Sequence, residues 1–126
     1  MEPPREPREG RAGRRYDGRL RDSYGLDEQC EREVIQEYLT STEERFGRIT
    51  VAIEAGDCAP IVREAHSIKG GSRTIGDETL GNVCEALEHA ARRGEIASCG
   101  VLLTRARIEF AIMRDDLLDY IGQKAA

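Results

Sequence analysis

The sequence predicts an all-α protein, built as an antiparallel up-down-up-down four-helix bundle. Three observations lead to this prediction. Residues that favour strands are sparse, since only 5% of the 126 residues are aromatic and none is Trp. Apolar residues recur at steps of three and four along successive runs, which is the period of an amphipathic helix. The breaks between the later runs are short, and short connections place consecutive helices side by side in opposite directions.

The first 25 residues depart from this pattern. They hold seven Arg against five acidic residues, three of the four prolines and four glycines, with almost no apolar residues. Such a segment buries too little surface to offset the entropy lost on ordering, so residues 1–25 are predicted to be a disordered basic tail. A solvated leader is the simpler interpretation of its arginines, and contact with an acidic partner or RNA is the alternative. The helical domain is predicted over residues 26–126.

Two runs with helical spacing follow the tail. Asp27 is an N-cap candidate for the first run. Inside the region, Thr40 with Glu43 and Ser41 with Glu44 both fit a capping box. The two runs are therefore either separate helices, with the first a short extra helix ahead of the bundle, or one kinked helix. Their apolar residues are Val34, Ile35, Leu39, Phe46, Ile49, Ala52 and Ile53.

Paired stop and start signals delimit the next helices. Gly56 is followed by Asp57, and Gly76 by Asp77, which is the order of a glycine C-cap and an aspartate N-cap. The helix that they enclose has a stripe formed by Ile61, Ala65, Ile68, Ser72 and Ile75. The helix after it ends at Gly94 and has a stripe formed by Leu80, Val83, Cys84, Leu87 and Ala91.

The last helix is predicted from near Ser98 to about Gly122, which makes it roughly 37 Å long at 1.5 Å per residue. Its apolar residues are Leu102, Leu103, Ala106, Phe110, Met113, Leu117 and Tyr120. A chain of about 100 residues can bury a sufficient core in this arrangement.

Composition narrows the classes of function. Four scattered cysteines, none in a C-x-x-C pair, and two histidines without ligand spacing predict reduced thiols and no metal site. The sequence shows no apolar run of 18 residues and no signal peptide, so we expect no membrane span, no export and a cytoplasmic location. The net charge of −5 argues against nucleic acid as the main partner.

One histidine lies away from the apolar stripe of its helix. At 100° per residue, His66 lies about 140° from Ile61, whereas the stripe stays within about 40°. Lys69, Gly70 and Arg73 share the side of the helix where His66 lies. His66 is therefore predicted to be exposed rather than a core histidine.

The glycines after His66 need an explanation, because each costs the helix about 1 kcal/mol relative to alanine. Gly70, at i+4, has no side chain to crowd the imidazole. Gly71 is expected to reduce the side-chain bulk on the helix surface next to it. A partner's active site could then close over the ring. A neutral imidazole, with an ordinary pKa of about 6.5, is a competent nucleophile for phosphoryl transfer. Lys69 can supply positive charge to the phosphoryl group, and Arg73 can steer an acidic partner.

The stretch AHSIKGGSRTIG resembles the signature of histidine-containing phosphotransfer (HPt) domains, which is close to H-x-[LI]-K-G-x-[AS]-x-x-[LI]-G. The matching residues are His66, Ile68, Lys69, Gly70, Ser72, Ile75 and Gly76. The resemblance extends from about residue 30 to residue 122. AHSIKGG is also similar to the N-terminal phosphotransfer domain of chemotaxis histidine kinases, but no ATP-binding domain follows in this chain.

The resemblance implies a monomeric phosphorelay intermediate. His66 would accept a phosphoryl group from the phospho-aspartate of a receiver domain and pass it to another receiver. Lys69 would stabilise that group and Gly70 would give access. Partner contacts are expected at Val62, Ser67, Gly71 and Arg73. The catalytic Mg²⁺ would belong to the receiver, with no cofactor held by this chain and no kinase activity of its own. The expected partners are response-regulator receivers and a hybrid or sensor histidine kinase of a bacterial two-component system. Neither a membrane nor a nucleic acid is expected as a partner.

Two details of the site stay open. Family members often carry a polar residue on the preceding helix that orients the imidazole, and Arg45 and Arg48 are the candidates here. Ser72 is expected to serve packing rather than chemistry, His89 to lie on the surface and Cys84 to lie in the core.

Other functions are compatible with the same helices. A sensor-kinase dimerisation module usually follows its histidine with an acidic residue and a Thr-Pro or Asn-Pro pair. Here Ser67 follows His66, and no proline occurs after Pro60. A phosphotransfer module of a larger histidine kinase and a non-catalytic adaptor that binds receiver domains stay as alternatives.

Overall fold

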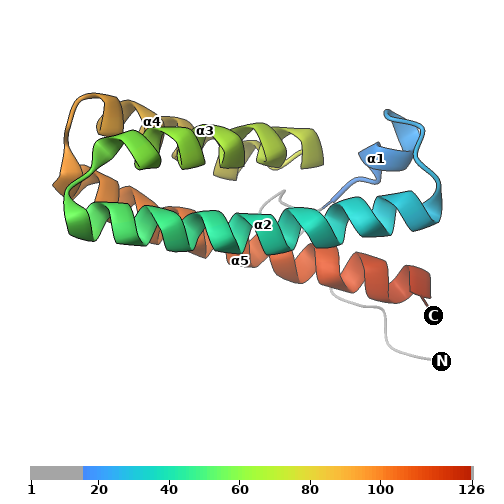
Figure 1. The fold of residues 1–126 in the computed structure, drawn as a ribbon. Helices are drawn as coiled ribbons and strands as arrows, with labels where there is room; N and C mark the ends of the chain where they lie inside the picture. Colours follow the sequence, from blue (N-terminus) through green and yellow to red (C-terminus); the bar gives the residue numbers. More distant parts are fainter. Residues whose placement is uncertain (1–15, 126) are drawn as a thin grey trace.

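The computed structural model describes residues 16–125, and all regular structure in that range is helical. The helices are α1 (Arg19–Asp22), α2 (Glu28–Ala55), α3 (Cys58–Ile75), α4 (Glu78–Arg92) and α5 (Ile96–Ala125). Helices α2 to α5 alternate in direction, and α3 lies between α2 and α4 (Figure 1). The predicted antiparallel four-helix bundle is therefore confirmed. The short helix α1 is not the predicted extra helix, because it lies within the first 25 residues.

Both predicted glycine–aspartate turns lie where the sequence places them. Gly56 and Gly76 end α2 and α3 with φ angles of 68° and 99°, in the left-handed region that glycine adopts without strain. The carboxylate of Asp57 accepts a bond from the backbone N–H of Ala59, and that of Asp77 accepts one from Leu80. These tight connections hold α3 against α2 on one side and against α4 on the other.

Helix α2 is continuous from Glu28 to Ala55, so of the two alternatives for this region the single helix is right and the pair of separate helices is wrong. Neither capping box begins a new helix, because the buried residues Tyr38, Thr42 and Phe46 continue one face across that region. Thr42 is itself buried in the bundle. Helix α5 begins at Ile96, two residues before the predicted start near Ser98.

Aromatic rings fill the contact between α2 and α5. The rings of Phe46 and Phe110 meet edge to face, with centroids 5.5 Å apart, and Tyr38 packs edge-on to Phe110 at 6.1 Å. The Tyr38 hydroxyl also shares a 3.0 Å hydrogen bond with the buried hydroxyl of Ser72 on α3. Ser72 therefore serves the packing of α3 on α2, and Cys84 is buried in the same core.

The prediction of a disordered tail over residues 1–25 is wrong for residues 16–25, and residues 1–15 lie outside the described range. Tyr16 and Leu20 are each 2% exposed. The Tyr16 hydroxyl donates to the buried carboxylate of Glu31 at 2.8 Å, and its backbone N–H donates to Asp116 at 2.6 Å. The segment is ordered because Tyr16 contacts Glu31 on α2 and packs edge to face against the ring of Tyr120 on α5. Helix α1 lies beyond the end of α3 (Figure 1).

Two features of the described residues bear on the class of protein. None of the helices over residues 16–125 has the length and apolar character needed to cross a membrane. In the same range, no cluster of three or more His, Cys, Asp or Glu side chains is placed to hold a metal ion.

The role of Tyr16 gives a stability prediction. Tyr16→Ala should lower the free energy of unfolding by about 3 kcal/mol, because it removes a buried ring and one of the donors to Glu31. Tyr24→Ala is the matched control, since Tyr24 is 57% exposed in the same segment, and it should change stability by less than about 0.5 kcal/mol. Urea denaturation measures both variants. Equal effects would show that the segment is not docked as described.

Candidate functional site

His66 lies on the outer side of α3, as the helical spacing predicts. The buried residues of α3 are the predicted stripe of Ile61, Ala65, Ile68, Ser72 and Ile75. The His66 side chain is 65% exposed, and one edge of its ring meets α4. A helix capped at both ends thus holds the imidazole at the surface without burying it.

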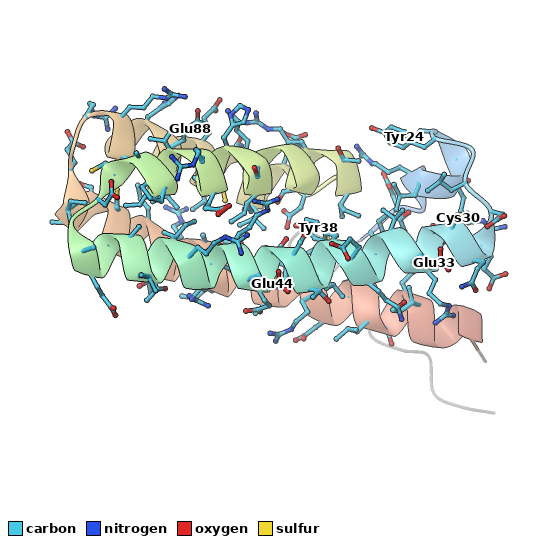
Figure 2. The ribbon with its side chains drawn as sticks, in the orientation of Figure 1. Tyr24, Cys30, Glu33, Tyr38, Glu44 and Glu88 are labelled. Carbon is cyan, nitrogen blue, oxygen red and sulfur yellow. The ribbon has the colours of Figure 1, made fainter. Side chains whose placement is uncertain are left out.

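A buried glutamate on α4 contacts this ring. Glu88 lies on the side of the bundle formed by α3 and α4 (Figure 2), and its side chain is only 5% exposed. Its Oε1 lies 3.3 Å from His66 Nδ1 and 2.9 Å from Lys69 Nζ. Its Oε2 accepts a 2.9 Å bond from the guanidinium of Arg92, one turn along α4. One carboxylate therefore joins three basic side chains from two helices.

The charge of Glu88 is maintained by these partners. Burial alone would raise the pKa of its carboxyl, but the hydrogen bonds from Arg92, Lys69 and His66 outweigh burial and lower the pKa to about 2. Glu88 is therefore an anion at neutral pH, and it can only accept hydrogen bonds. The tautomer of His66 that fits such a neighbour carries its hydrogen on Nδ1 and leaves the lone pair on Nε2.

The two glycines after Lys69 have different surroundings. A Cβ added at Gly70 would meet no atom within 4 Å, so packing within the bundle does not require glycine there. A Cβ added at Gly71 would lie 3.4 Å from the ring of Tyr38 on α2. Gly71 thus faces α2 rather than the flank of the imidazole, which corrects the expectation that it thins the strip beside His66.

The other predicted partner residues lie on different sides of α3. Ser67 is exposed and Val62 packs partly against the core. Lys69 is not a free surface lysine, since its side chain is 16% exposed and its ammonium is bound to Glu88. Arg73 is held by carboxylates of α4 rather than projecting freely. The structure thus brings Lys69 to His66 through Glu88 and places Ser67 and Gly71 on the side toward α2.

The two candidates for orienting the imidazole bind elsewhere. Arg45 and Arg48 both donate to the carboxylate of Glu64, at 2.6 and 2.5 Å. The residue that contacts His66 comes instead from the following helix, α4. The expectation of an orienting residue on the preceding helix is therefore not met by either arginine. His89, beside Glu88 in sequence, is exposed as expected.

Sequence reasoning missed Glu88 and Arg92, although a signal for Glu88 was present. Two antiparallel helices joined by a tight turn place residues at equal distances from that turn opposite each other. His66 precedes Asp77 by eleven residues, and Glu88 follows Asp77 by eleven. This hairpin symmetry pairs the one acidic residue on the inner side of α4 with the histidine.

Comparisons with known proteins give one family model and a similar solved structure. A family model described as the Hpt domain matches residues 33–121. A solved structure with a similar fold is histidine-containing phosphotransfer protein B (HptB) from Pseudomonas aeruginosa PAO1. That chain is 31% identical, with a TM-score of 0.79, and the match covers 86% of this chain and 95% of that one. No curated protein sequence matches this chain.

The lowered pKa of Glu88 predicts a pH-dependent contribution to stability. A carboxyl with a depressed folded-state pKa stabilises the fold above its unfolded pKa of about 4.3 and loses that contribution as the pH falls. Glu88→Gln should therefore be less stable than the parent protein at pH 7, by about 1–3 kcal/mol. The difference should shrink between pH 5 and about 2, where Glu88 itself becomes protonated. Urea titrations at several pH values measure the difference in the free energy of unfolding between the two proteins. A difference that stays the same from pH 7 to pH 2 would contradict an ionised Glu88.

Proposed function

The chain belongs to the Hpt domain family, and we propose that His66 is the residue through which it carries a phosphoryl group. Histidine phosphotransfer in a two-component phosphorelay is the function of this family, whose members interact with receiver domains and kinases. In our proposal His66 takes the group from the phospho-aspartate of one receiver and passes it to another. The observation that carries the proposal is an exposed imidazole whose Nδ1 faces a buried, ionised carboxylate.

The proposed chemical step uses Nε2 as the nucleophile. Its lone pair attacks the phosphorus, the Nε2–P bond forms, and the P–O bond to aspartate breaks, so that the aspartate leaves as a carboxylate. The ring gains positive charge as this happens. Glu88 accepts the Nδ1–H hydrogen bond and stabilises the cationic ring, and it keeps the ring in the reactive tautomer beforehand. Attack by the carboxylate of a second receiver reverses the step.

The cations around Glu88 have a second role in the proposal. A phosphoryl group brings a charge near −2 and three acceptor oxygens. Lys69 and Arg92 both hold Glu88 before transfer, and the Arg92 side chain is 59% exposed. Either can turn toward the phosphoryl oxygens while the other keeps Glu88 paired. The Mg²⁺ that assists the exchange is expected in the receiver, where the phospho-aspartate lies.

The receiver must also reach the ring and hold its position. Gly70 leaves open space one turn after His66, and Ser67 leads from His66 toward α2. Between α2 and α3 lies a cavity of about 310 Å³ whose lining includes Tyr38, Ser67 and Gly71. Tyr38 projects from α2 toward α3 at this place (Figure 2). We propose that an apolar side chain of the receiver enters this cavity while the phospho-aspartate meets His66.

The proposed unit is a monomer that works in the cytoplasm. The four cysteines of the chain are free thiols, as expected in a reducing compartment. Among the alternatives, a non-catalytic adaptor would bind receivers without becoming labelled at His66. A phosphotransfer module of a larger kinase would be labelled at His66 and would receive its phosphoryl group from ATP through that kinase.

The central variant is His66→Gln. Incubation with a phosphorylated receiver domain should label the parent protein with an acid-labile, base-stable phosphoryl group. Label should be absent from His66→Gln, and Lys69→Ala should reduce the rate by roughly tenfold, which corresponds to about 1.4 kcal/mol of lost charge stabilisation. His89→Gln is the matched control and should be labelled normally. Persistent label on His66→Gln rules out the assignment, and receiver binding without label in the parent protein favours the adaptor.

The access role of Gly70 has its own comparison. Gly70→Leu should slow transfer from a receiver by roughly tenfold or more, since the new side chain would stand beside the ring that the receiver must cover. Gly47→Leu is the control, because Gly47 is also an exposed glycine inside a helix with no atom within 4 Å of its added Cβ. Both variants should remain folded by circular dichroism. Unchanged transfer in Gly70→Leu would refute the access role.

A further inference from the structure

An arginine of α3 lies directly on a glycine of α4, two turns from the site. A Cβ added at Gly81 would come within 2.9 Å of Arg73 Cγ and 3.0 Å of its Nε. Cγ belongs to the stem of the side chain rather than to its far end, so a Cβ at position 81 would require Arg73 to shift. Gly81 is buried. The absence of a side chain at position 81 therefore lets the stem of Arg73 rest on the backbone of α4.

The charged end of Arg73 is held by the same helix. Its Nη2 donates to Asn82 at 3.1 Å and lies 3.4 Å from a carboxylate oxygen of Glu85. Its Nε lies 3.5 Å from Glu78. All three partners belong to α4, so Arg73 connects α3 and α4 at one level of the bundle. The carboxylates of Glu78 and Glu85 largely balance its charge. Arg73 therefore attracts an acidic partner less strongly than a free arginine would.

This contact has the same register as the reactive pair. Arg73 lies seven residues after His66 on α3, and Gly81 lies seven residues before Glu88 on α4. Seven residues correspond to about 10 Å along a helix. Because both helices are rigid over that length, their spacing at Arg73 and Gly81 determines their spacing at His66 and Glu88.

The reactive contact is sensitive to this spacing. The distance between His66 Nδ1 and Glu88 Oε1 is 3.3 Å, which is near the long end of the range for a hydrogen bond. A further separation of a few tenths of an ångström would break it. Lys69 and Arg92 would still keep Glu88 paired, so the bundle could remain folded while the ring lost its orientation.

We propose that Arg73, seated on Gly81, is a positioning residue for His66: it fixes the spacing and register of α3 and α4 so that Glu88 reaches Nδ1. The consequence for phosphotransfer rests on the proposed function of His66, whereas the effect on the ring does not. The first measurement is therefore independent of phosphoryl transfer.

Nuclear magnetic resonance of protein labelled with ¹⁵N-histidine reports the ring tautomer. The chain has only two histidines, and a His89→Gln spectrum assigns the signals of His66. In the parent protein the signals should be those of the Nδ1–H tautomer. In Arg73→Ala and in Gly81→Ala they should move toward a mixture of tautomers. The variant that carries both Arg73→Ala and Gly81→Ala should resemble Arg73→Ala alone, because the new Cβ at position 81 has no Arg73 side chain to collide with.

The second measurement is the rate at which phosphoramidate, a small phosphoryl donor, labels His66. Both single variants should be slower by about three- to tenfold, and their effects should not add. Arg93→Ala is the control, since Arg93 is the C-cap of α4 and forms its ion pair with Glu95, in the connection to α5; it should leave the ring signals and the rate unchanged.

Ring signals that stay at the parent position in both single variants would overturn the positioning role, as would an equal shift in Arg93→Ala. Failure of phosphoramidate to label the parent protein would count instead against the proposed function. The ring spectra would still decide the positioning role in that case.

Discussion

The structure around His66 depends on one buried carboxylate. Glu88 is held inside the α3–α4 contact by three basic side chains, two from α3 and one from α4. A buried carboxylate without such partners would be strongly destabilising, because the loss of its hydration would not be compensated. With them it stays ionised and presents an acceptor to His66 Nδ1. The same interaction thus stabilises the packing of two helices and sets the chemistry of the ring.

The rest of the bundle fixes α3 so that this interaction can form. On the side opposite α4, α3 is joined to α2 by the bond between Tyr38 and Ser72 and by the close approach of Gly71 to the Tyr38 ring. The longer helices α2 and α5 extend beyond α3, and there the segment around Tyr16 contacts both of them (Figure 1). His66 therefore lies on a helix held by two neighbouring helices, while its ring stays exposed beside the open space at Gly70. A reactive group on a rigid helix keeps its geometry better than one on a loop.

Much of the fold was predictable from local patterns, because caps and apolar stripes are properties of neighbouring residues. The turns at Gly56 and Gly76, and the buried stripe from Ile61 to Ile75, follow from such patterns. The ordered structure around Tyr16 could not be predicted in this way. Its partners Glu31 and Asp116 lie far along the chain on α2 and α5, and the composition of the first 25 residues indicates disorder. The sequence left the continuity of α2 undecided, because two good capping boxes compete locally with a buried face that only the assembled bundle provides.

For the site, the position of His66 on an outer face follows from helical spacing, but its neighbour does not. In the sequence alone, Glu88 is indistinguishable from an ordinary acidic residue at the edge of an apolar stripe. Its partner becomes apparent only when α3 and α4 are folded about Asp77. The assignment of Gly71 shows the same difficulty, since glycines adjacent in sequence face different helices.

The most direct test of the role of Glu88 is the position of the phosphoryl group on the ring. Phosphorylated protein labelled with ¹⁵N-histidine can be examined for coupling between phosphorus and each ring nitrogen of His66. If Glu88 holds the hydrogen on Nδ1, phosphorus must be bonded to Nε2, and coupling to that nitrogen is expected. A phosphoryl group bonded to Nδ1 would contradict it, because that nitrogen could not then donate to the carboxylate.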